Sequence, residues 1–432
     1  MNKVISIIFI LCVSILYSQQ TPAPIQKNLI AIKGAKAHIG NGKTIDNSLI
    51  IFENGILNYV GDNIKKDLSN CVVIKAFGKS VYPGFIIPNS TLGLIEIDAV
   101  RASDDVSEIG KWNPHIRSLI AYNTESRVVE TMRPNGVLIA QITPRGGIIS
   151  GRSSIVNLDA WNWEDAVIKT DDGIHMNWPN NYSYGRWWEG EDPGLKVNNE
   201  YYNTVNDIET YFSNAKAHLN KSNNKINLPF ESMKDLFNNK TKLYIHVDDK
   251  KGIIDAVTLA KKHRINKITI VGGYESHKIT DFLIKNNISV LLQRVHLRPE
   301  KNDEDYDLPY KLAKKLVDSG VTVGLEASGD MERMNSRNLP FYAGTTVAYG
   351  LSKEQALQLI TLNTAKILGI DKNYGSLEVG KSATLFISDG DALDIRTNKL
   401  LNAFIDGREI SLESHQTKLW KRYSKKYQIP IK

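Results

Sequence analysis

The sequence predicts an α/β protein in which a long middle region is flanked by two β-rich segments. Short apolar runs with Gly-containing turns occupy residues 28–80 and 373–412, so both chain ends are expected to build one small β-domain. Between them, in residues 81–372, strand-like runs alternate with helical patterns. Such repeats produce a parallel sheet, either open or closed into a barrel, and periodicity alone does not distinguish the two.

The first residues predict an export signal rather than part of the fold. Lys3 precedes an apolar run over residues 4–17, and Ser18 offers a small residue at a cleavage point. The run is too short to cross a bilayer comfortably, and an uncleaved anchor is the alternative interpretation. We therefore predict a signal peptide over residues 1–18, a linker over 19–27, and a soluble periplasmic or extracellular protein with no membrane span after cleavage.

Charge and cysteine usage exclude two classes. The formal net charge is +7, which becomes +6 when Lys3 is removed, and the lysines are spread along the chain. No basic stripe with interleaved aromatic residues is present, so a nucleic-acid partner is not expected. Cys12 lies in the predicted signal and leaves Cys71 alone in the mature chain, which excludes an intramolecular disulfide.

Turn motifs mark the strands of the β-rich ends. Gly-Asn-Gly-Lys at residues 40–43 and Glu-Asn-Gly at 53–55 separate apolar runs, as in β-hairpins. Near the other end, residues 383–388 and 403–407 form short strands with Gly-containing turns. The two ends are therefore predicted to share one sheet-rich domain.

The second part of the middle region shows the clearest alternation of strands and helices. Apolar spacing and Ser352-Lys-Glu-Gln355, a capping box, identify the helices. The predicted strands are 242–246, 267–271, 289–292 and 322–325, and the predicted helices are 253–263, 278–285, 308–319 and one from the capping box to about 367.

An aromatic-rich stretch interrupts this pattern. Five of the seven tryptophans lie in residues 159–205, among Asn, Asp and Gly. As an insertion, this stretch either lines a ligand pocket with rigid aromatic walls or packs its own aromatic side chains over the barrel as a lid. Residues 413–432 are predicted to be a basic C-terminal tail.

Four segments in order resemble the amidohydrolase superfamily, in its imidazolonepropionase-like and exported prolidase-like branch. They are residues 79–87, with Tyr-Pro-Gly-Phe, 338–351, 361–369, with Thr-x-Asn-x-Ala, and 375–383, with Gly-Ser-Leu-Glu-Val-Gly-Lys. The resemblance extends over about residues 28 to 410. It implies a distorted (β/α)8 TIM-like barrel plus a small composite β-sandwich domain, with the active site at the carboxyl ends of the barrel strands.

The resemblance also implies one or two divalent metals that activate a water molecule. The family's ligands are a His-x-His pair on strand one, a carboxylate or modified lysine on strand four, histidines on strands five and six, and an aspartate on strand eight. In this chain Asn89 and Thr91 stand in place of the pair, and Ser328 in place of the aspartate. His246 matches strand five, but residues 270–275 hold no histidine for strand six.

A reduced or relocated metal site is one consequence of this pattern. His246 and Glu326 are its predicted ligands, with one divalent metal, preferably zinc, or none; Asp330 and Ser328 are the predicted catalytic residues. The alternatives are a hydrogen-bonded core histidine at 246 and an ordinary salt-bridge network of Glu326, Asp330 and Arg333.

Substrate binding is predicted for Arg145, Asn89 and Thr91. Arg145 lies in the Gly-rich segment 143–154, where glycines permit close backbone approach and a guanidinium could grip a carboxylate, or where the chain simply turns between two strands. Weaker candidates near the expected strand ends or loops are Glu96, Asp98, His115, His175 and His296.

Two functions follow. The first is hydrolysis of C–N bonds in a cyclic amide or short peptide. The second is a catalytically silent barrel that binds a ligand, with a homo-oligomer or an active amidohydrolase paralogue as its partner. Loss of the histidine pair together with the aspartate favours the second, because each loss weakens metal binding or proton transfer.

Overall fold

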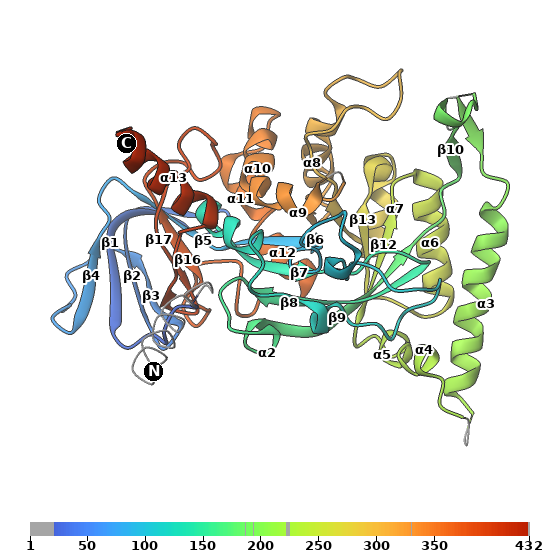
Figure 1. The fold of residues 1–432 in the computed structure, drawn as a ribbon, viewed down its shortest axis with the longest axis horizontal. Helices are drawn as coiled ribbons and strands as arrows, with labels where there is room; N and C mark the ends of the chain where they lie inside the picture. The colour runs from blue at the N-terminus through green and yellow to red at the C-terminus, as the bar shows by residue number, and fades with distance from the viewer. Residues whose placement is uncertain (1–20, 186, 193, 222–224, 330, 431–432) are drawn as a thin grey trace, which may run out of the picture.

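The computed structural model describes residues 21–185, 187–192, 194–221, 225–329 and 331–430, which form two large sheets, a small two-stranded sheet and the helices around them (Figure 1). The predicted signal peptide and Asp330 lie outside the described residues. Among the described helices, none is both long and apolar enough to cross a membrane.

The first sheet takes strands from both chain ends, as predicted. Its strand order is β18-β17-β16-β5-β1-β2-β3, with β4 paired to β1. Its strands are β1 (Leu29–His38), β2 (Thr44–Glu53), β3 (Ile56–Asp62), β4 (Cys71–Lys75), β5 (Ser80–Pro83), β16 (Leu385–Ser388), β17 (Leu400–Ile405) and β18 (Arg408–Glu409). In Figure 1 the blue N-terminal strands and the red C-terminal strands lie side by side in this sheet.

Local chemistry explains the shape of this composite sheet. Asn54 and Gly55 join β2 to β3 with φ angles of 51° and 80°, which Asn and Gly adopt at low cost. Phe52 of β2 and Phe404 of β17 meet edge to face, with ring centroids 5.1 Å apart, although β16, β5 and β1 separate their strands in the sheet. The sheet therefore curls over itself around an apolar interior.

The second sheet is the predicted barrel, in the order β15-β14-β13-β12-β9-β8-β7-β6. Its strands are β6 (Phe85–Ser90), β7 (Val137–Ile142), β8 (Ile149–Asn157), β9 (Val167–Asn177), β12 (Lys242–Val247), β13 (Ile268–Gly272), β14 (Ser289–Leu292) and β15 (Val323–Leu325). The barrel is distorted because β8 runs antiparallel to both β7 and β9, whereas the other pairs are parallel. Residues 359 and 360 bridge the remaining gap, since their carbonyls accept the amides of Leu325 (3.1 Å) and Ile86 (2.9 Å).

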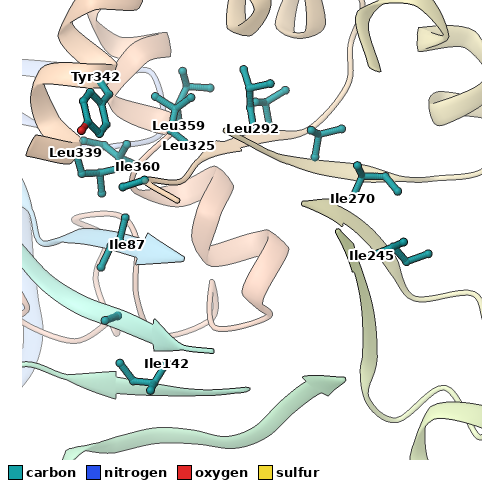
Figure 2. Packing of buried hydrophobic residues seen from close by; sticks show 14 of the residues in the cluster. Ile87, Ile142, Ile245, Ile270, Leu292, Leu325, Leu339, Tyr342, Leu359 and Ile360 are labelled. Atoms are coloured by element: carbon teal, nitrogen blue, oxygen red, sulfur yellow. The ribbon is translucent and has the colours of Figure 1, made fainter. Parts of the chain in front are cut away.

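Helices surround the second half of the barrel and pack on its apolar outer surface. They include α6 (Lys250–Lys262), α7 (Thr280–Lys285), α8 (Leu308–Asp318), α9 (Glu332–Asn335), α10 (Leu339–Ala348) and α11 (Lys353–Gln358). The helix α12 (Leu362–Leu368) packs instead against the barrel interior. Figure 2 shows Ile245, Ile270 and Leu292, which come from the neighbouring strands β12, β13 and β14, within this buried cluster. The predicted capping box at Ser352 is confirmed.

The prediction of one helix from Ser352 to about residue 367 is wrong. The chain forms α11 and α12, which are separated at residues 359–361. The break has a physical reason: the carbonyls of Leu359 and Ile360 face strands β15 and β6, so they cannot also serve a continuous helix.

The aromatic stretch 159–205 is not a single insertion, because it contains β9, a strand of the barrel. The excursion from the barrel begins after β9 with Trp178, whose buried indole donates to the hydroxyl of Tyr201 at 3.0 Å. Before β9 the stretch contains α2 (Trp163–Ala166), and after Trp178 the chain forms β10 (Tyr182–Tyr184), β11 (Leu195–Val197), α3 (Tyr201–Leu219), α4 (Leu228–Glu231) and α5 (Lys234–Phe237). The predicted tail contains a helix, α13 (His415–Tyr427), which begins with a capping box at Ser414.

The interior of the barrel has an apolar end and a polar end. Residues from β6, β7, β8, β12, β13 and β14 pack against Ala365, Ile367 and Leu368 of α12. Lys169 and Lys242, near the amino ends of β9 and β12, donate to carbonyls at the end of α12. Helix α12 therefore covers the amino end, and polar side chains occupy the carboxyl end.

Candidate active site

Glu326 is the most deeply buried carboxyl group at the carboxyl end of the barrel. It follows β15 directly, and its side chain is fully shielded from solvent. Oε2 accepts the backbone amide of Ser328 (2.7 Å) and Nδ2 of Asn89 (3.1 Å), and Oε1 accepts the Ser328 hydroxyl (2.6 Å). Burial outweighs these hydrogen bonds and raises the pKa of Glu326 to about 7.

Asn89 joins Glu326 to the neighbouring strand. It ends β6 with a φ of 50°, a left-handed conformation that Asn tolerates better than most residues. Its amide N–H donates to Oε1 of Gln141 at 3.0 Å while its side chain donates to Glu326. The predicted pair Asn89 and Ser328 thus meets at Glu326, whereas Thr91 is buried nearby in sequence and has no side-chain hydrogen bond to this carboxyl group.

Arg145 fastens the loop after β7 to the rest of the carboxyl end. Its guanidinium donates to the carbonyl of Asn89 (2.9 Å) and to both oxygens of Glu332 (3.0 Å each), with longer contacts to the carbonyls of Thr143 and Pro144. In the structure Arg145 lies beside Asn89 at the carboxyl end of the barrel. Its N–H groups, however, already donate to the carboxylate of Glu332, so the predicted binding of a substrate carboxylate by Arg145 would require this salt bridge to break.

His246 lies on β12 beside a second histidine of β9. Nε2 of His246 and Nδ1 of His175 are 2.9 Å apart. His175 is fully buried and stacks on Tyr244, with ring centroids 4.6 Å apart, whereas His246 is partly exposed. Burial, and to a smaller extent the charge of Arg145, lowers the pKa of His246 to about 3; burial lowers that of His175 strongly as well. Both rings are therefore neutral at pH 7.

Buried polar side chains connect the two histidines to Asn89. Nε2 of His175 is 2.9 Å from the hydroxyl of Ser153, which donates to Oδ1 of Asp172 at 2.7 Å. Oδ2 of Asp172 accepts Nε2 of Gln141 (3.0 Å) and the hydroxyl of Tyr244 (2.8 Å). Because Gln141 also accepts from Asn89, one hydrogen-bonded network extends from Glu326 to His246.

Several of these residues were not predicted from the sequence: Gln141, Ser153, Asp172, Tyr244 and Glu332. They lie inside strands or after a loop and match no motif. No period-two pattern identifies them, because β8 and β9 are rich in polar residues and Asp171, with a φ of 47°, interrupts the regular alternation of β9.

Other predicted candidates lie elsewhere. Nε2 of His296 contacts the hydroxyl of Thr345 at 2.7 Å, and Glu96 accepts Asn123 and Ser126. In the suggested network of Glu326, Asp330 and Arg333, the guanidinium of Arg333 pairs with Asp98 at 2.7 Å and not with Glu326, and Asp330 lies outside the described residues. A strand-end position alone does not bring a side chain to the centre of the barrel.

Comparison with known proteins agrees with this architecture. The model of the amidohydrolase family matches residues 225–412. The chain is 23% identical over 380 residues to an imidazolonepropionase of Picrophilus torridus, covering 82% of this chain and 88% of the relative. It is 25% identical over 187 residues to an imidazolonepropionase of Flavobacterium psychrophilum, covering 39% of this chain and 46% of the relative. The crystal structure of an amidohydrolase from Thermotoga maritima superposes with a TM-score of 0.77 at 23% identity, over 88% of this chain and 99% of that one.

By this match, residues 225–412 belong to the amidohydrolase family. The structural likeness shows the fold, and the family match lies in the second half of the barrel and the return to the composite sheet. The family model does not cover the first half of the barrel, so the roles of its residues at the carboxyl end follow from their own contacts and chemistry.

The donor set of this amidohydrolase does not fit the metal site that the superfamily implies. Among the described residues, no group of three His, Cys, Asp or Glu side chains is arranged to hold a metal ion. One nitrogen of His246 faces His175, three donors occupy the oxygens of Glu326, and the cationic Arg145 lies close enough to lower the pKa of His246. The buried Oδ1 of Asn89, which lacks a hydrogen-bond partner among the described residues, is one neutral oxygen and not a substitute for two imidazoles.

Proposed function

We propose that this amidohydrolase hydrolyses a C–N bond of a cyclic amide or short peptide at the carboxyl end of its barrel. The observation that carries the proposal is that one hydrogen-bonded network contains both Glu326 and His246. Glu326 is a fully buried carboxyl group with its pKa raised to about 7, and His246 is a neutral imidazole. A group that titrates near neutral pH can both give and take a proton efficiently. The imidazolonepropionase names of the relatives support a cyclic amide as the substrate class.

The roles of the side chains follow from their donors and acceptors. In its protonated form Glu326 can supply a proton to the departing nitrogen. Ser328 is placed to pass this proton on, because its hydroxyl lies 2.6 Å from Oε1 of Glu326 and is less deeply buried. His246 can accept the proton of the attacking water. Asn89 orients Glu326, since its Nδ2 donates to Oε2. No step is assigned to a metal ion, because the donor set does not fit one.

A hydrolysis assay tests the proposal. The purified mature protein is incubated with imidazolone propionate, simple cyclic amides and dipeptides that end in proline, and the new amino or carboxyl groups are measured. We expect turnover of at least one of these classes, and a loss of about 100-fold or more in kcat for Glu326→Gln. Glu354→Gln is the matched control, since this carboxylate binds His38 in the composite sheet, and it should retain full activity. Absence of turnover with all three classes would contradict the proposal.

A silent ligand-binding barrel is the second candidate. The observation that favours it is the salt bridge between Arg145 and Glu332, because it occupies a guanidinium that would otherwise be available to bind a substrate. Calorimetric binding of a cyclic amide without turnover would support this candidate. Metal analysis of the same sample tests the relocated metal: stoichiometric zinc that is lost in His246→Ala would contradict both metal-independent hydrolysis and a silent barrel.

The sequence of the first residues also supports a location. We propose that the protein acts outside the cytoplasm, because residues 4–17 have the length and composition of a signal sequence. Mass spectrometry of the secreted or periplasmic fraction should find a mature N-terminus at Gln19, and a full-length chain in the cytoplasm would contradict export.

A further inference from the structure

We infer that Asp172, Ser153 and His175 form a directional hydrogen-bond relay that holds His246 in its Nε2–H tautomer, so that Nδ1 of His246 is the proton acceptor. The direction of the relay follows from the geometry of buried groups alone. The use of Nδ1 to take a proton from water rests on the proposed function.

Asp172 sets the direction. Its side chain accepts from Ser153 on Oδ1 and from Gln141 and Tyr244 on Oδ2, at 2.7, 3.0 and 2.8 Å. A carboxylate has no proton to return, so the hydroxyl proton of Ser153 must point to Asp172. The opposite orientation would place two oxygen lone pairs against each other at 2.7 Å.

The remaining steps are fixed by counting protons. A serine hydroxyl has one proton, so Ser153 can only accept from Nε2 of His175 at 2.9 Å. His175 therefore carries its proton on Nε2 and has a lone pair on Nδ1. That lone pair faces Nε2 of His246 at 2.9 Å, which must then be the protonated nitrogen. In a neutral ring this leaves Nδ1 of His246 without a proton.

Packing makes the relay rigid at one end and accessible at the other. Ser153, Asp172 and His175 are all buried, and the ring of His175 lies parallel to Tyr244 with an interplanar angle of 10°. His246 is partly exposed at the end of β12. Burial lowers the pKa of both histidines, which keeps the rings neutral as the proton count requires.

The chemical consequence is a balanced proton transfer. As the oxygen of water forms a bond to the amide carbon, one O–H bond breaks and that proton goes to Nδ1 of His246. The ring becomes an imidazolium whose Nε2–H still donates to His175. When the C–N bond breaks, the leaving nitrogen takes a proton from Glu326. His246 then gives up the proton on Nδ1 and Glu326 is protonated again, so that both groups return to their starting forms. Water and amide are converted to acid and amine, and no group changes its oxidation state. Asp172, Ser153 and His175 are positioning residues in this scheme.

Nuclear magnetic resonance of the histidine side chains reads the relay directly. In protein labelled with ¹⁵N in histidine, we expect His175 and His246 to show the neutral Nε2–H pattern, unchanged between pH 6 and pH 9, with assignment by His175→Gln and His246→Gln. A neutral Nδ1–H pattern for His246 would overturn the relay whatever the activity of the protein. The expected tautomers without any hydrolysis would leave the relay standing and contradict the proposed function.

Asp172→Asn gives a sharper test, because it should reverse the relay. The donors Gln141 and Tyr244 hold the amide oxygen at the Oδ2 position, so the new NH₂ group faces Ser153. We expect Ser153 then to donate to Nε2 of His175, which at 2.9 Å is nearer than the carbonyl of Gly173 at 3.5 Å, and this moves the proton of each histidine to Nδ1. Asp171→Asn is the matched control, since Asp171 pairs with Arg117 on the other face of β9, and it should leave both tautomers unchanged. Retention of the Nε2–H pattern in a folded Asp172→Asn protein would contradict the inference.

A serine pair provides a kinetic test that does not change charge. Ser153→Ala removes the acceptor of His175, whereas Ser154→Ala changes the adjacent hydroxyl, which accepts the amide of Asp171 instead. We expect kcat to fall about 10- to 100-fold in Ser153→Ala with little change in KM, the usual cost of losing a partner that orients a functional histidine. Ser154→Ala should keep kcat. Equal kcat values for both variants would contradict the positioning role.

Discussion

The first four strands of the barrel, β6 to β9, and the last four, β12 to β15, are built in different ways. In the last four, parallel strands alternate with helices, and apolar side chains such as Ile270 and Leu292 fill the space between the strands and the helices. In the first four, β8 runs antiparallel to its neighbours, and the interior faces carry Gln141, Ser153, Asp172 and His175. The regular half provides a stable frame, and the irregular half provides most of the polar network.

This difference predicts different sensitivities. Apolar packing is lost gradually, in proportion to the volume removed. A buried polar network is stable only while every member has its partner, because an unpaired buried charge or hydrogen-bonding group is costly. Substitutions matched between the two halves can therefore separate the two kinds of stabilisation.

The largest effect is expected in the first half, at Asp159. This buried carboxylate follows β8 and binds the buried guanidinium of Arg133 at 2.6 Å and that of Arg408 in β18 at 3.1 Å, so it also ties the barrel to the composite sheet. Asp159→Ala leaves Arg133 without its carboxylate and should lower the free energy of unfolding by about 3–5 kcal/mol. Urea denaturation measures this loss. The pair of Asp394 with the exposed Arg396 is the control, and Asp394→Ala should cost much less.

The second half should respond to a packing change. Leu292 is fully buried at the end of β14, and Leu292→Ala should cost about 3 kcal/mol through lost contacts and a residual cavity. Ile284→Ala on the solvent side of α7, where the side chain is 47% exposed, should cost less than about 1 kcal/mol. Thermal unfolding of both variants provides the comparison. Similar losses for the two variants would mean that the second half is not held by the packing described above.

The regular half was also the half that the sequence predicted well. Strand β14 matches its prediction at both ends, β12 extends one residue further, and α8 ends one residue earlier than predicted. The prediction succeeded because each strand and helix buries a continuous apolar face, which leaves a clear period in the sequence. The composite sheet was likewise predictable from its Gly-containing turns.

The first half was less predictable for physical reasons. Strand β9 was hidden inside the aromatic stretch, because its interior polar residues and its exposed start weaken the apolar pattern. Five predicted site residues lie at or just after the carboxyl ends of strands, as the resemblance implies, and their roles stay predictions: Asn89, Arg145, His246, Glu326 and Ser328. Asp172 and Ser153 act through side-chain contacts between different strands, and a single sequence does not reveal such contacts.

Glu326 provides a pH test of the second half. Its pKa in the folded protein, about 7, lies above the value of about 4.5 for an exposed glutamate. Its contribution to stability is therefore complete below pH 4.5 and is lost as the pH rises to about 7. Between pH 5 and pH 8 the wild type should lose up to about 2 kcal/mol relative to Glu326→Gln, which has no titrating group at this position. The difference between the two proteins, measured by urea denaturation across this range, should stay constant only if Glu326 is not buried as described.

The smallest effect is expected where the two halves meet. Tyr244 of β12 donates its hydroxyl to Asp172 of β9, and its ring supports His175. Tyr244→Phe keeps the ring and removes one of the three donors to Asp172, so it should cost about 1–2 kcal/mol. Tyr122→Phe is the control, because the buried hydroxyl of Tyr122 has no hydrogen-bond partner among the described residues, and its removal should be neutral or slightly stabilising. Equal stabilities for the two variants would show that the contact between the halves is apolar packing alone; a loss confined to Tyr244→Phe would show that the stable frame of the second half depends on the polar network of the first.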